Sequence, residues 1–457
     1  MSATPAMRRG RSEAPSSMKR SIIFGAQSVA RRLGRLEPRH ILAYLVIASL
    51  AWRIVWHGLS ALLAPHDPRT ALVFDAADPT TLIQLAQREL APNDDGRAES
   101  ARSIAARLLA VDPLAPGALS LYGKAVAQLG DAERAERILR LAAAHLPIDL
   151  VAHAWLYDSA LANGRLLEAL DELDTLLRAR PSLAQQLAPS LQAMLSSGAA
   201  VEDRFFRQLA AAPPWRAAIV AELAPIIKDP NALLRLFARL QASKARPSDA
   251  EMSVLLARLL RDGLYDEAYA AWLAHLPQER LAQLGLLYNE RFQYPVSNLP
   301  FDWTFTPTSG ATIALTEEGG RKSLSVEFYG ARVAFSNVAH MLMLAPGRYA
   351  FTGAAGTDDL DNELGLRWRI YCAANPSQTL ATTRLLKKTT PLRAFRVELT
   401  VPSEGCDAQW LKLEIPVRIV SDADVSGSAH YVNLAVESLA RASSSSNAAG
   451  AIVHDRK

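Results

Sequence analysis

The sequence predicts a multidomain α plus β protein: one transmembrane helix, then a solenoid of helical repeats, then an antiparallel β-sandwich. Three observations predict it: a mostly apolar run at 41–64, a 34-residue period after it, and short alternating segments from about residue 295. We expect a basic cytoplasmic tail over 1–40, helical repeats over 80–290, the sandwich over 295–440 and a disordered tail over 441–457.

The net charge of +4 is carried by the N-terminal tail. Residues 1–40 hold nine Lys/Arg and two Glu, which gives +7, whereas the chain after Arg53 holds 40 Lys/Arg and 44 Asp/Glu. Binding to nucleic-acid phosphates needs cations on the folded surface. The charge pattern therefore argues against a nucleic-acid partner.

The run ILAYLVIASLAWRIVWHGLSALLA at 41–64 is interrupted by Arg53 and His57 alone. About 20 apolar residues are enough to cross a bilayer. The preceding cations indicate a cytoplasmic N-terminus, and the bulk of the chain then lies in the periplasm of a bacterial inner-membrane protein. A cleaved signal peptide fits less well, because the charged region is too long and Leu62 stands where cleavage needs a small residue. A buried amphipathic helix is the other alternative.

A 34-residue period follows the apolar run. Its marks are the turn glycines Gly96, Gly130 and Gly164, the small residues Ala101, Ala135 and Ala169, and the helix-ending prolines Pro113, Pro147 and Pro181. Glycine allows the positive φ of a tight turn, alanine allows two helices to cross closely, and proline ends a helix. Such units bury their apolar faces by stacking on one another.

This pattern resembles the tetratricopeptide repeat. The unit at 119–147 matches best, with Tyr122 and Gly123 as the family's large–small pair, and the stretch at 254–277 repeats the spacing with Gly263, Ala268 and Trp272. The family's Trp at the fourth position of the unit is absent, and 183–250 looks helical without a clear register. The resemblance implies a solenoid that binds a protein partner and catalyses nothing.

Short β-type segments make up the C-terminal part, separated by Gly, Pro, Asn and Asp as in an antiparallel sandwich. They are SLSVEFYG (323–330), GRYAFTGAAG (347–356), LGLRWRIYC (364–372), RAFRVELTVP (393–402) and WLKLEIPVRIV (410–420). Alternation in the third segment places Leu364, Leu366, Trp368, Ile370 and Cys372 on one face. We therefore expect Trp368 in the core.

Cys372 and Cys406 are the chain's two cysteines, and both lie in this β region. Outside the cytoplasm, a disulfide between them would form and persist. The alternative is two buried free thiols.

The NLPFDW start, the LAPGRYAFTG turn and the length resemble jelly-roll carbohydrate-binding modules. Such modules stack sugar rings on exposed aromatic side chains beside polar groups. The resemblance makes Trp410, Tyr371, Arg367 and Arg369 candidate glycan contacts. The alternative places Trp410 in a second core or a domain interface.

The sequence contains no phosphate-binding loop, zinc motif or hydrolase elbow. Asp358, Asp359, Asp361 and Glu363 form an acidic loop that could supply oxygen ligands to Ca²⁺, although we favour a solvated turn. We expect no enzyme activity, no cofactor and no metal.

The function hypothesis is a non-catalytic, inner-membrane-anchored scaffold. Its repeats would bind a protein partner and its sandwich would bind glycan, in the assembly or export of a capsule or exopolysaccharide. This assignment rests on architectural analogy. The alternative is an envelope assembly, division or secretion adaptor that binds no glycan.

Overall fold

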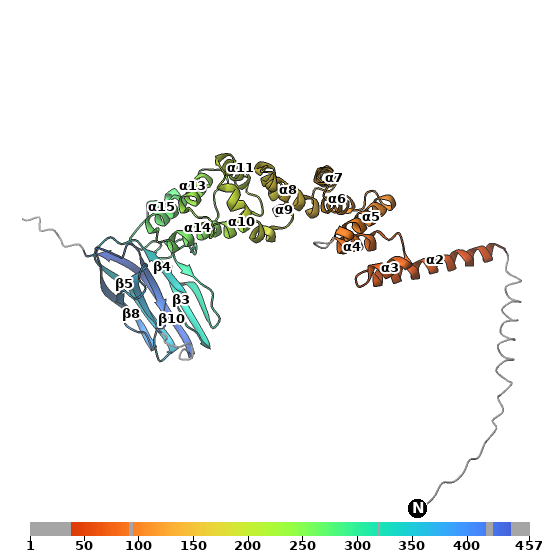
Figure 1. The fold of residues 1–457 in the computed structure, drawn as a ribbon. Coiled ribbons are helices and arrows are strands. Elements are labelled where there is room, and N and C mark those ends of the chain that lie inside the picture. The colour runs from red at the N-terminus through yellow and green to blue at the C-terminus, as the bar shows by residue number, and fades with distance from the viewer. Residues whose placement is uncertain (1–37, 91–94, 319, 417–423, 440–457) are drawn as a thin grey trace, which may run out of the picture. The chain divides into compact units, whose positions relative to one another are not determined.

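The computed structural model describes residues 38–90, 95–318, 320–416 and 424–439. The predicted tail over 441–457 lies outside them, as do residues 1–37 of the N-terminal tail. Pro38–His40 already belong to the first helix. The chain divides into two compact units, residues 1–159 and 160–457, which we describe separately (Figure 1).

The first unit is helical. Its elements are α2 (Pro38–Leu63), α3 (Pro68–Phe74), α4 (Pro79–Glu89), α5 (Asp95–Val111), α6 (Ala118–Gln128), α7 (Ala132–His145) and most of α8 (Leu150–Ala162). Asp67, Asp78 and Asp131 cap α3, α4 and α7, because each side chain accepts a backbone N–H of the first turn.

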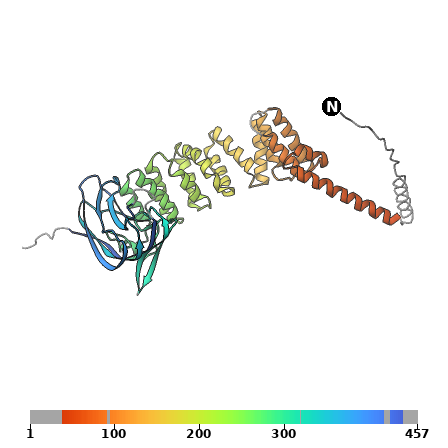
Figure 2. The same ribbon diagram turned by 90° about the horizontal axis from the view of Figure 1, so that it is seen from below.

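Helix α2 contains one stretch long and apolar enough to cross a membrane, Leu42–Leu63, with a mean hydropathy of 1.5 (Figure 2). Only 6% of its most apolar window is buried in the protein. Near its C-terminal end, the Trp56 and Phe74 rings lie 5.0 Å apart and His57 Nδ1 lies 3.1 Å from Asp75 Oδ2. An exposed apolar surface of this length is compatible with a membrane anchor.

Most of the repeat marks lie at helix hairpins. Gly130, with φ of +90°, separates α6 from α7. Gly123 packs on α7, where an added Cβ would lie 2.7 Å from the Leu139 side chain, so this position requires the smallest residue. Ala101 and Ala135 are fully buried on α5 and α7, which end just before Pro113 and Pro147. The prediction that Gly96 is a turn glycine was wrong, because Gly96 lies within the first turn of α5 and not in a turn before that helix.

The second unit continues with helices and ends in strands. The helices are α9 (Leu166–Ala179), α10 (Ala184–Leu195), α11 (Ala199–Ala210), α12 (Arg216–Leu223), α13 (Pro230–Gln241), α14 (Asp249–Arg261), α15 (Tyr265–His275) and α16 (Gln278–Leu281). Gly164 and Gly263 take positive φ before α9 and α15. Ala169 and Ala268 are buried on those helices, and Pro181 follows the end of α9.

In the described part of the chain, ten strands form a two-sheet antiparallel sandwich. They are β1 (Thr304–Phe305), β2 (Ala311–Glu318), β3 (Arg321–Arg332), β4 (Val338–Leu342), β5 (Gly347–Asp361), β6 (Arg367–Cys372), β7 (Thr379–Thr382), β8 (Lys388–Val401), β9 (Gln409–Glu414) and β10 (Asp424–Ser438). One sheet has the order β1-β4-β9-β6-β7 and the other β2-β3-β10-β5-β8. Strands β7 and β8 are therefore edge strands, and a short connection joins them.

The sandwich core is aromatic. Trp368 is 1% exposed, which confirms its predicted core position, and its ring lies 5.8 Å from Trp303 and from Phe351. Cys372 and Cys406 form a disulfide, which confirms the predicted pairing. Cys406 lies in the loop before β9, so the bridge joins a strand to a loop and not two strands.

The NLPFDW segment anchors the start of the sandwich. Buried Asp302 accepts hydrogen bonds from Ser297 N and Oγ at 2.9 and 2.8 Å and from Asn289 Nδ2 at 3.2 Å. Trp303 donates its indole N–H to Asn289 O at 3.1 Å. The Phe301 ring packs against Tyr269 and Trp272 of α15, at 5.2 and 5.6 Å. The segment thus ties the last long helix to the sandwich.

Candidate functional site

The predicted glycan contacts do meet on one face of the sheet that contains β6 and β9. In the register of these strands Tyr371 lies opposite Trp410, and Arg367 lies opposite Glu414. The alternation read from the sequence therefore places the four candidate residues together. Trp410 is half-buried, however, and not fully exposed.

The polar groups of this face bind one another. Arg367 Nη2 lies 2.9 Å from Glu414 Oε1, and Arg369 lies over the Tyr371 ring at 4.6 Å. Arg369 also donates to Thr379 Oγ1 at 2.9 Å and to the Pro376 carbonyl. Tyr371 is only 8% exposed. The aromatic face on which a sugar would stack is thus already covered by a guanidinium.

The Trp410 ring is also partly covered. Lys412 Nζ lies 5.2 Å from its centroid, and Met341, its neighbour on β4, is 2% exposed. Met341 N donates to Pro300 O at 2.7 Å, which places the chain entering the sandwich beside this strand. These contacts leave the Trp410 ring less open than the predicted platform requires.

A cleft of about 570 Å³ lies elsewhere on the sandwich, on the side where β7 and β8 form the edges of the two sheets. Three aromatic residues from three strands line it: Phe395, which is partly exposed, and Trp368 and Tyr431, which are each 1% exposed. Three cations line it as well: Arg384 and Lys387 from the β7–β8 connection, and Arg393 from β8. Apolar side chains with a few polar groups are typical of ligand sites.

Two polar atoms of the cleft-lining side chains have no hydrogen-bond partner. They are Trp368 Nε1 and Tyr431 Oη, both buried, and the two rings lie 5.4 Å apart. A buried donor left without a partner costs about 1–3 kcal/mol. Burial also raises the pKa of Tyr431 well above its usual range, so the phenol stays protonated and remains a donor. Such orphaned donors are the kind of group that a bound ligand satisfies.

Gly365 lies against the β7–β8 connection, which forms one wall of the cleft. Its φ is +80°, and an added Cβ would lie 3.0 Å from Leu385 Cβ and 3.1 Å from Leu386 O. Leu366 and Leu386 exchange backbone hydrogen bonds at 3.0 and 2.8 Å. The glycine therefore allows the β7–β8 connection to lie directly against the start of β6, which fixes the position of Arg384 and Lys387.

The sequence did not reveal this cleft. Trp368 was predicted to be core, but Tyr431 lies on β10, which was not among the predicted strands, and the cations lie in or next to a connection without a motif.

The prediction of an acidic loop was wrong, because Asp358, Asp359 and Asp361 belong to the end of β5. Among the residues that the structure describes, no group of three or more His, Cys, Asp or Glu could hold a metal.

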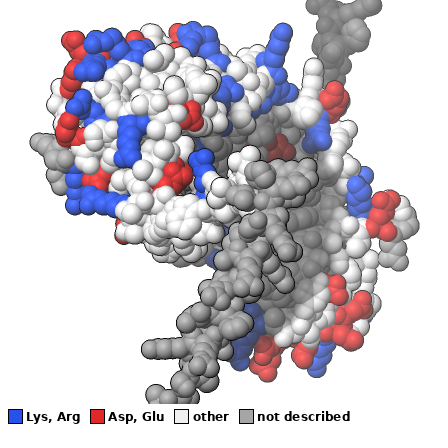
Figure 3. Space-filling view, turned by 90° about the vertical axis from the view of Figure 1, so that its right-hand side faces the viewer, with Lys and Arg blue, Asp and Glu red and all other residues white. Residues whose placement is uncertain are grey.

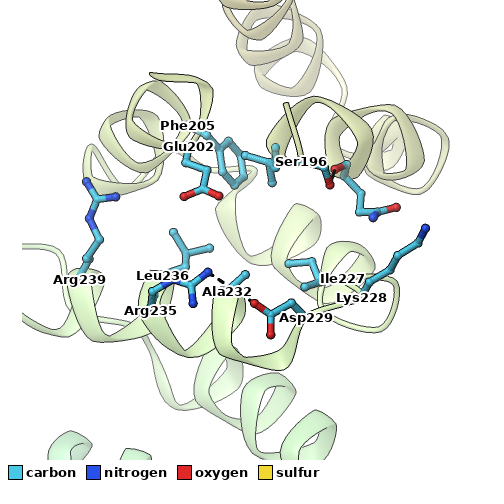
Figure 4. Close-up of a pocket in the computed structure, with 12 residues that line it drawn as sticks. Ser196, Glu202, Phe205, Ile227, Lys228, Asp229, Ala232, Arg235, Leu236 and Arg239 are labelled. Carbon is cyan, nitrogen blue, oxygen red and sulfur yellow. Dashed lines mark hydrogen bonds and ion pairs between the residues drawn. The ribbon is translucent and has the colours of Figure 1, made fainter. Parts of the chain in front are cut away.

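A second hollow, of about 330 Å³, lies in the helical part of the second unit. Figure 4 shows Glu202 and Phe205 of α11 on one side, and Ala232 and Leu236 of α13 on the other. Asp229 and Arg235 form an ion pair of 3.5 Å at its border. On the face shown in Figure 3, cations and carboxylates are interspersed, without a broad area of one sign.

No family model matches the sequence, and no curated protein matches it. Solved structures do resemble it over about a third of the chain. One, described as "CBM4 structure and function", has 13% identity and a TM-score of 0.27, and covers 33% of this chain and 99% of its own. A putative sugar-binding protein from Bacteroides thetaiotaomicron has 11% identity and a TM-score of 0.26, covering 34% and 100%. A "Family 16 Carbohydrate Binding Module-2" has 16% identity and a TM-score of 0.24, covering 33% and 99%.

Proposed function

We propose that this protein is a non-catalytic scaffold of the bacterial inner membrane, anchored by α2 with its bulk in the periplasm. Its tetratricopeptide-type helices bind a protein partner, and its β-sandwich binds glycan during the assembly or export of a polysaccharide. The observation that carries the glycan-binding part is the cleft between the sheet edges, where an aromatic lining contains two buried donors without acceptors.

Sugar rings fit this lining chemically. Their C–H faces pack on aromatic rings, while their hydroxyl and ring oxygens accept hydrogen bonds from N–H and O–H groups. The volume of about 570 Å³ falls in the usual range of ligand pockets. The face around Trp410 offers less, because its rings are covered by Arg369 and Lys412.

The test is calorimetric titration of the full-length protein, in detergent micelles, with a panel of extracellular polysaccharide fragments. Ala394→Trp fills the cleft from an exposed position of β8, and Thr400→Trp places the same ring on β8 away from the cleft. We expect saturable binding that Ala394→Trp abolishes and Thr400→Trp retains. Trp410→Ala serves as the probe of the other face, and we expect it to change the affinity little.

Binding that is lost in Trp410→Ala and retained in Ala394→Trp would move the glycan to the face first predicted. No heat with any fragment would contradict glycan binding altogether. That result would favour the second candidate, an envelope adaptor that binds protein alone.

One observation supports this second candidate, namely the hollow between α11 and α13 (Figure 4). A photo-crosslinking amino acid at Ala232, inside the hollow, is expected to capture a partner. The same group at the exposed Asp203 of α11, outside the lining, is the control. Equal capture from both positions would contradict a specific peptide site there.

A further inference from the structure

We propose that the cleft lined by β8 and the β7–β8 connection selects a sugar that carries a carboxylate, such as a uronic acid. The inference rests on the proposed glycan-binding function and adds the chemical class of the ligand. The observation behind it is which arginines of the sandwich pair with a carboxylate and which do not.

Seven arginines of the sandwich have described side chains between residues 304 and 438, and five of them pair with carboxylates. The five are Arg332, Arg348, Arg367, Arg369 and Arg396, whose partners are Asp424, Glu398, Glu414, Glu414 and Glu437. The other two, Arg384 and Arg393, make no ion pair with any described residue, and both line the cleft. Among the sandwich arginines with described side chains, the two without a carboxylate partner thus line the same cleft.

The third cation of the cleft is held in position. Lys387 Nζ donates to the Glu363 carbonyl, a neutral acceptor that leaves its charge uncompensated. None of the described Asp or Glu residues lines the cleft. Asp359 lies outside the lining, where its carboxylate accepts a hydrogen bond from Thr389 Oγ1 at 3.0 Å. The cleft lining therefore carries positive charge without a carboxylate of its own.

A carboxylate-bearing sugar meets each feature of this lining. Its carboxylate can accept two parallel N–H bonds from a guanidinium, which is the strongest pairing that arginine makes. Its ring packs on Phe395, the partly exposed aromatic ring of the lining. Its oxygens bring acceptors to Trp368 Nε1 and Tyr431 Oη, which are buried and have none. A neutral sugar would supply acceptors to Trp368 Nε1 and Tyr431 Oη but would leave the three cations of the lining without a carboxylate.

The test compares tetragalacturonate with its fully methyl-esterified form, which keeps the same skeleton and removes the charge. Both are titrated calorimetrically into the full-length protein in detergent micelles. We expect the acid to bind more tightly than the ester by roughly tenfold or more, since hydrogen bonds to charged groups are the stronger class. We also expect this preference to shrink as the salt concentration rises.

The variant that tests the location is Arg384→Gln combined with Arg393→Gln. Both side chains are exposed, so the substitutions leave the fold intact, which an unchanged circular dichroism spectrum and melting temperature verify. The matched control is Arg348→Gln combined with Arg396→Gln, which removes two paired arginines from the same sheet. We expect the first variant to lose the preference for the acid and the control to keep it.

Equal affinity for the acid and its ester would overturn the inference and leave glycan binding in place. A preference for the acid that persists in the cleft variant, or disappears equally in the control, would overturn it too. If neither tetrasaccharide binds while a neutral fragment of the panel does, the ligand class is wrong and the proposed function stands. If no glycan binds at all, both fail together.

Discussion

The Arg216 guanidinium and the Glu251 carboxylate form a buried, two-point ion pair between α12 and α14. The Nε–Oε1 and Nη2–Oε2 distances are 2.7 and 2.8 Å. Glu251 also accepts from Ser248 N at 2.8 Å, which closes a capping box at the start of α14. Arg216 donates in addition to Leu209 O and Ala245 O. One pair of side chains thus joins four segments of the helical part.

Removing one member of this pair should destabilise the helical part strongly. Glu251→Ala leaves the Arg216 charge buried, and we expect a loss of about 3–5 kcal/mol. Asp203→Ala is the control, because it breaks an exposed pair with Arg239 that is worth about 1 kcal/mol or less. The measurement is the urea transition followed by circular dichroism. Similar shifts of the urea midpoint in the two variants would show that the buried pair stabilises the protein no more than the exposed pair does.

The same pair should make stability depend on pH. Burial alone would raise the pKa of Glu251, but the bonds from Arg216 and Ser248 outweigh it and hold the pKa below its ordinary value of 4.5. Because the pKa is lower in the folded state, the stabilisation is complete above 4.5 and is lost as pH falls through the folded pKa.

We therefore expect the urea midpoint of the native protein to fall between pH 6 and pH 3. The fall should be smaller in Glu251→Gln, which has no carboxylate to protonate at this position. Identical pH profiles for the two proteins would mean that other carboxylates control the acid transition.

Loss of the Cys372–Cys406 bridge should destabilise the sandwich. The bridge closes a loop with a sequence separation of 34, and we expect its removal to cost about 3–4 kcal/mol. The double variant Cys372→Ala/Cys406→Ala should melt at a lower temperature than the oxidised protein and should no longer respond to dithiothreitol. A thiol assay on the denatured native protein should find no reactive cysteine, and two reactive thiols would contradict the bridge.

Tyr431→Phe should leave the ligand-free protein as stable as before or more so, by up to about 1–2 kcal/mol. It removes a buried hydroxyl that has no partner, and with it the cost of desolvating that group. Tyr349→Phe is the matched control, because the Tyr349 hydroxyl donates to Ala345 O at 2.9 Å. That variant should lose about 1 kcal/mol. Thermal melting measures both variants: Tyr431→Phe should keep or raise the melting temperature, and Tyr349→Phe should lower it. A lowered melting temperature in Tyr431→Phe would contradict the prediction.

Deleting residues 1–64 should release the protein from membranes. Helix α2 exposes large apolar side chains along its length, among them Leu45, Ile54 and Leu62 at 62, 71 and 71%. We expect the full chain to resist extraction with alkaline carbonate and the truncated chain to be soluble. The control inserts two charges into the segment, as Val46→Lys/Leu50→Lys, and should abolish anchoring without shortening the chain. Full release of the native chain by carbonate would contradict a spanning anchor.

Local chemistry explains the parts of the fold that the sequence predicted. A turn needs Gly at Gly130 or Gly164 wherever its neighbours fall, and Pro113 ends a helix without help from tertiary contacts. Trp368 was predicted from strict alternation, which holds because β6 has one face in the core and one outside. The two cysteines, with the expected location outside the cytoplasm, were enough to predict their pairing.

Strands β4 and β10 were missed for a physical reason. All five residues of β4 are buried, because both of its faces are covered, so its sequence does not alternate. The pairing of β10 shifts between Val425 and Ser426 and again between Val432 and Ala435, and each shift interrupts the alternation. Strict alternation of apolar and polar residues identifies strands with one buried and one solvent-exposed face, and these two strands do not alternate in that way.

The sequence by itself determined the helical hairpins, the core position of Trp368 and the shared face of Tyr371 and Trp410 on β6 and β9, because each depends on spacing along the chain. The tertiary structure alone decided which of these groups stay available for a ligand. Arg369 covers Tyr371, whereas Arg384 and Arg393 remain without a carboxylate beside Trp368 and Tyr431. Availability depends on the neighbours that distant segments bring together, and those neighbours are set by packing and not by local sequence.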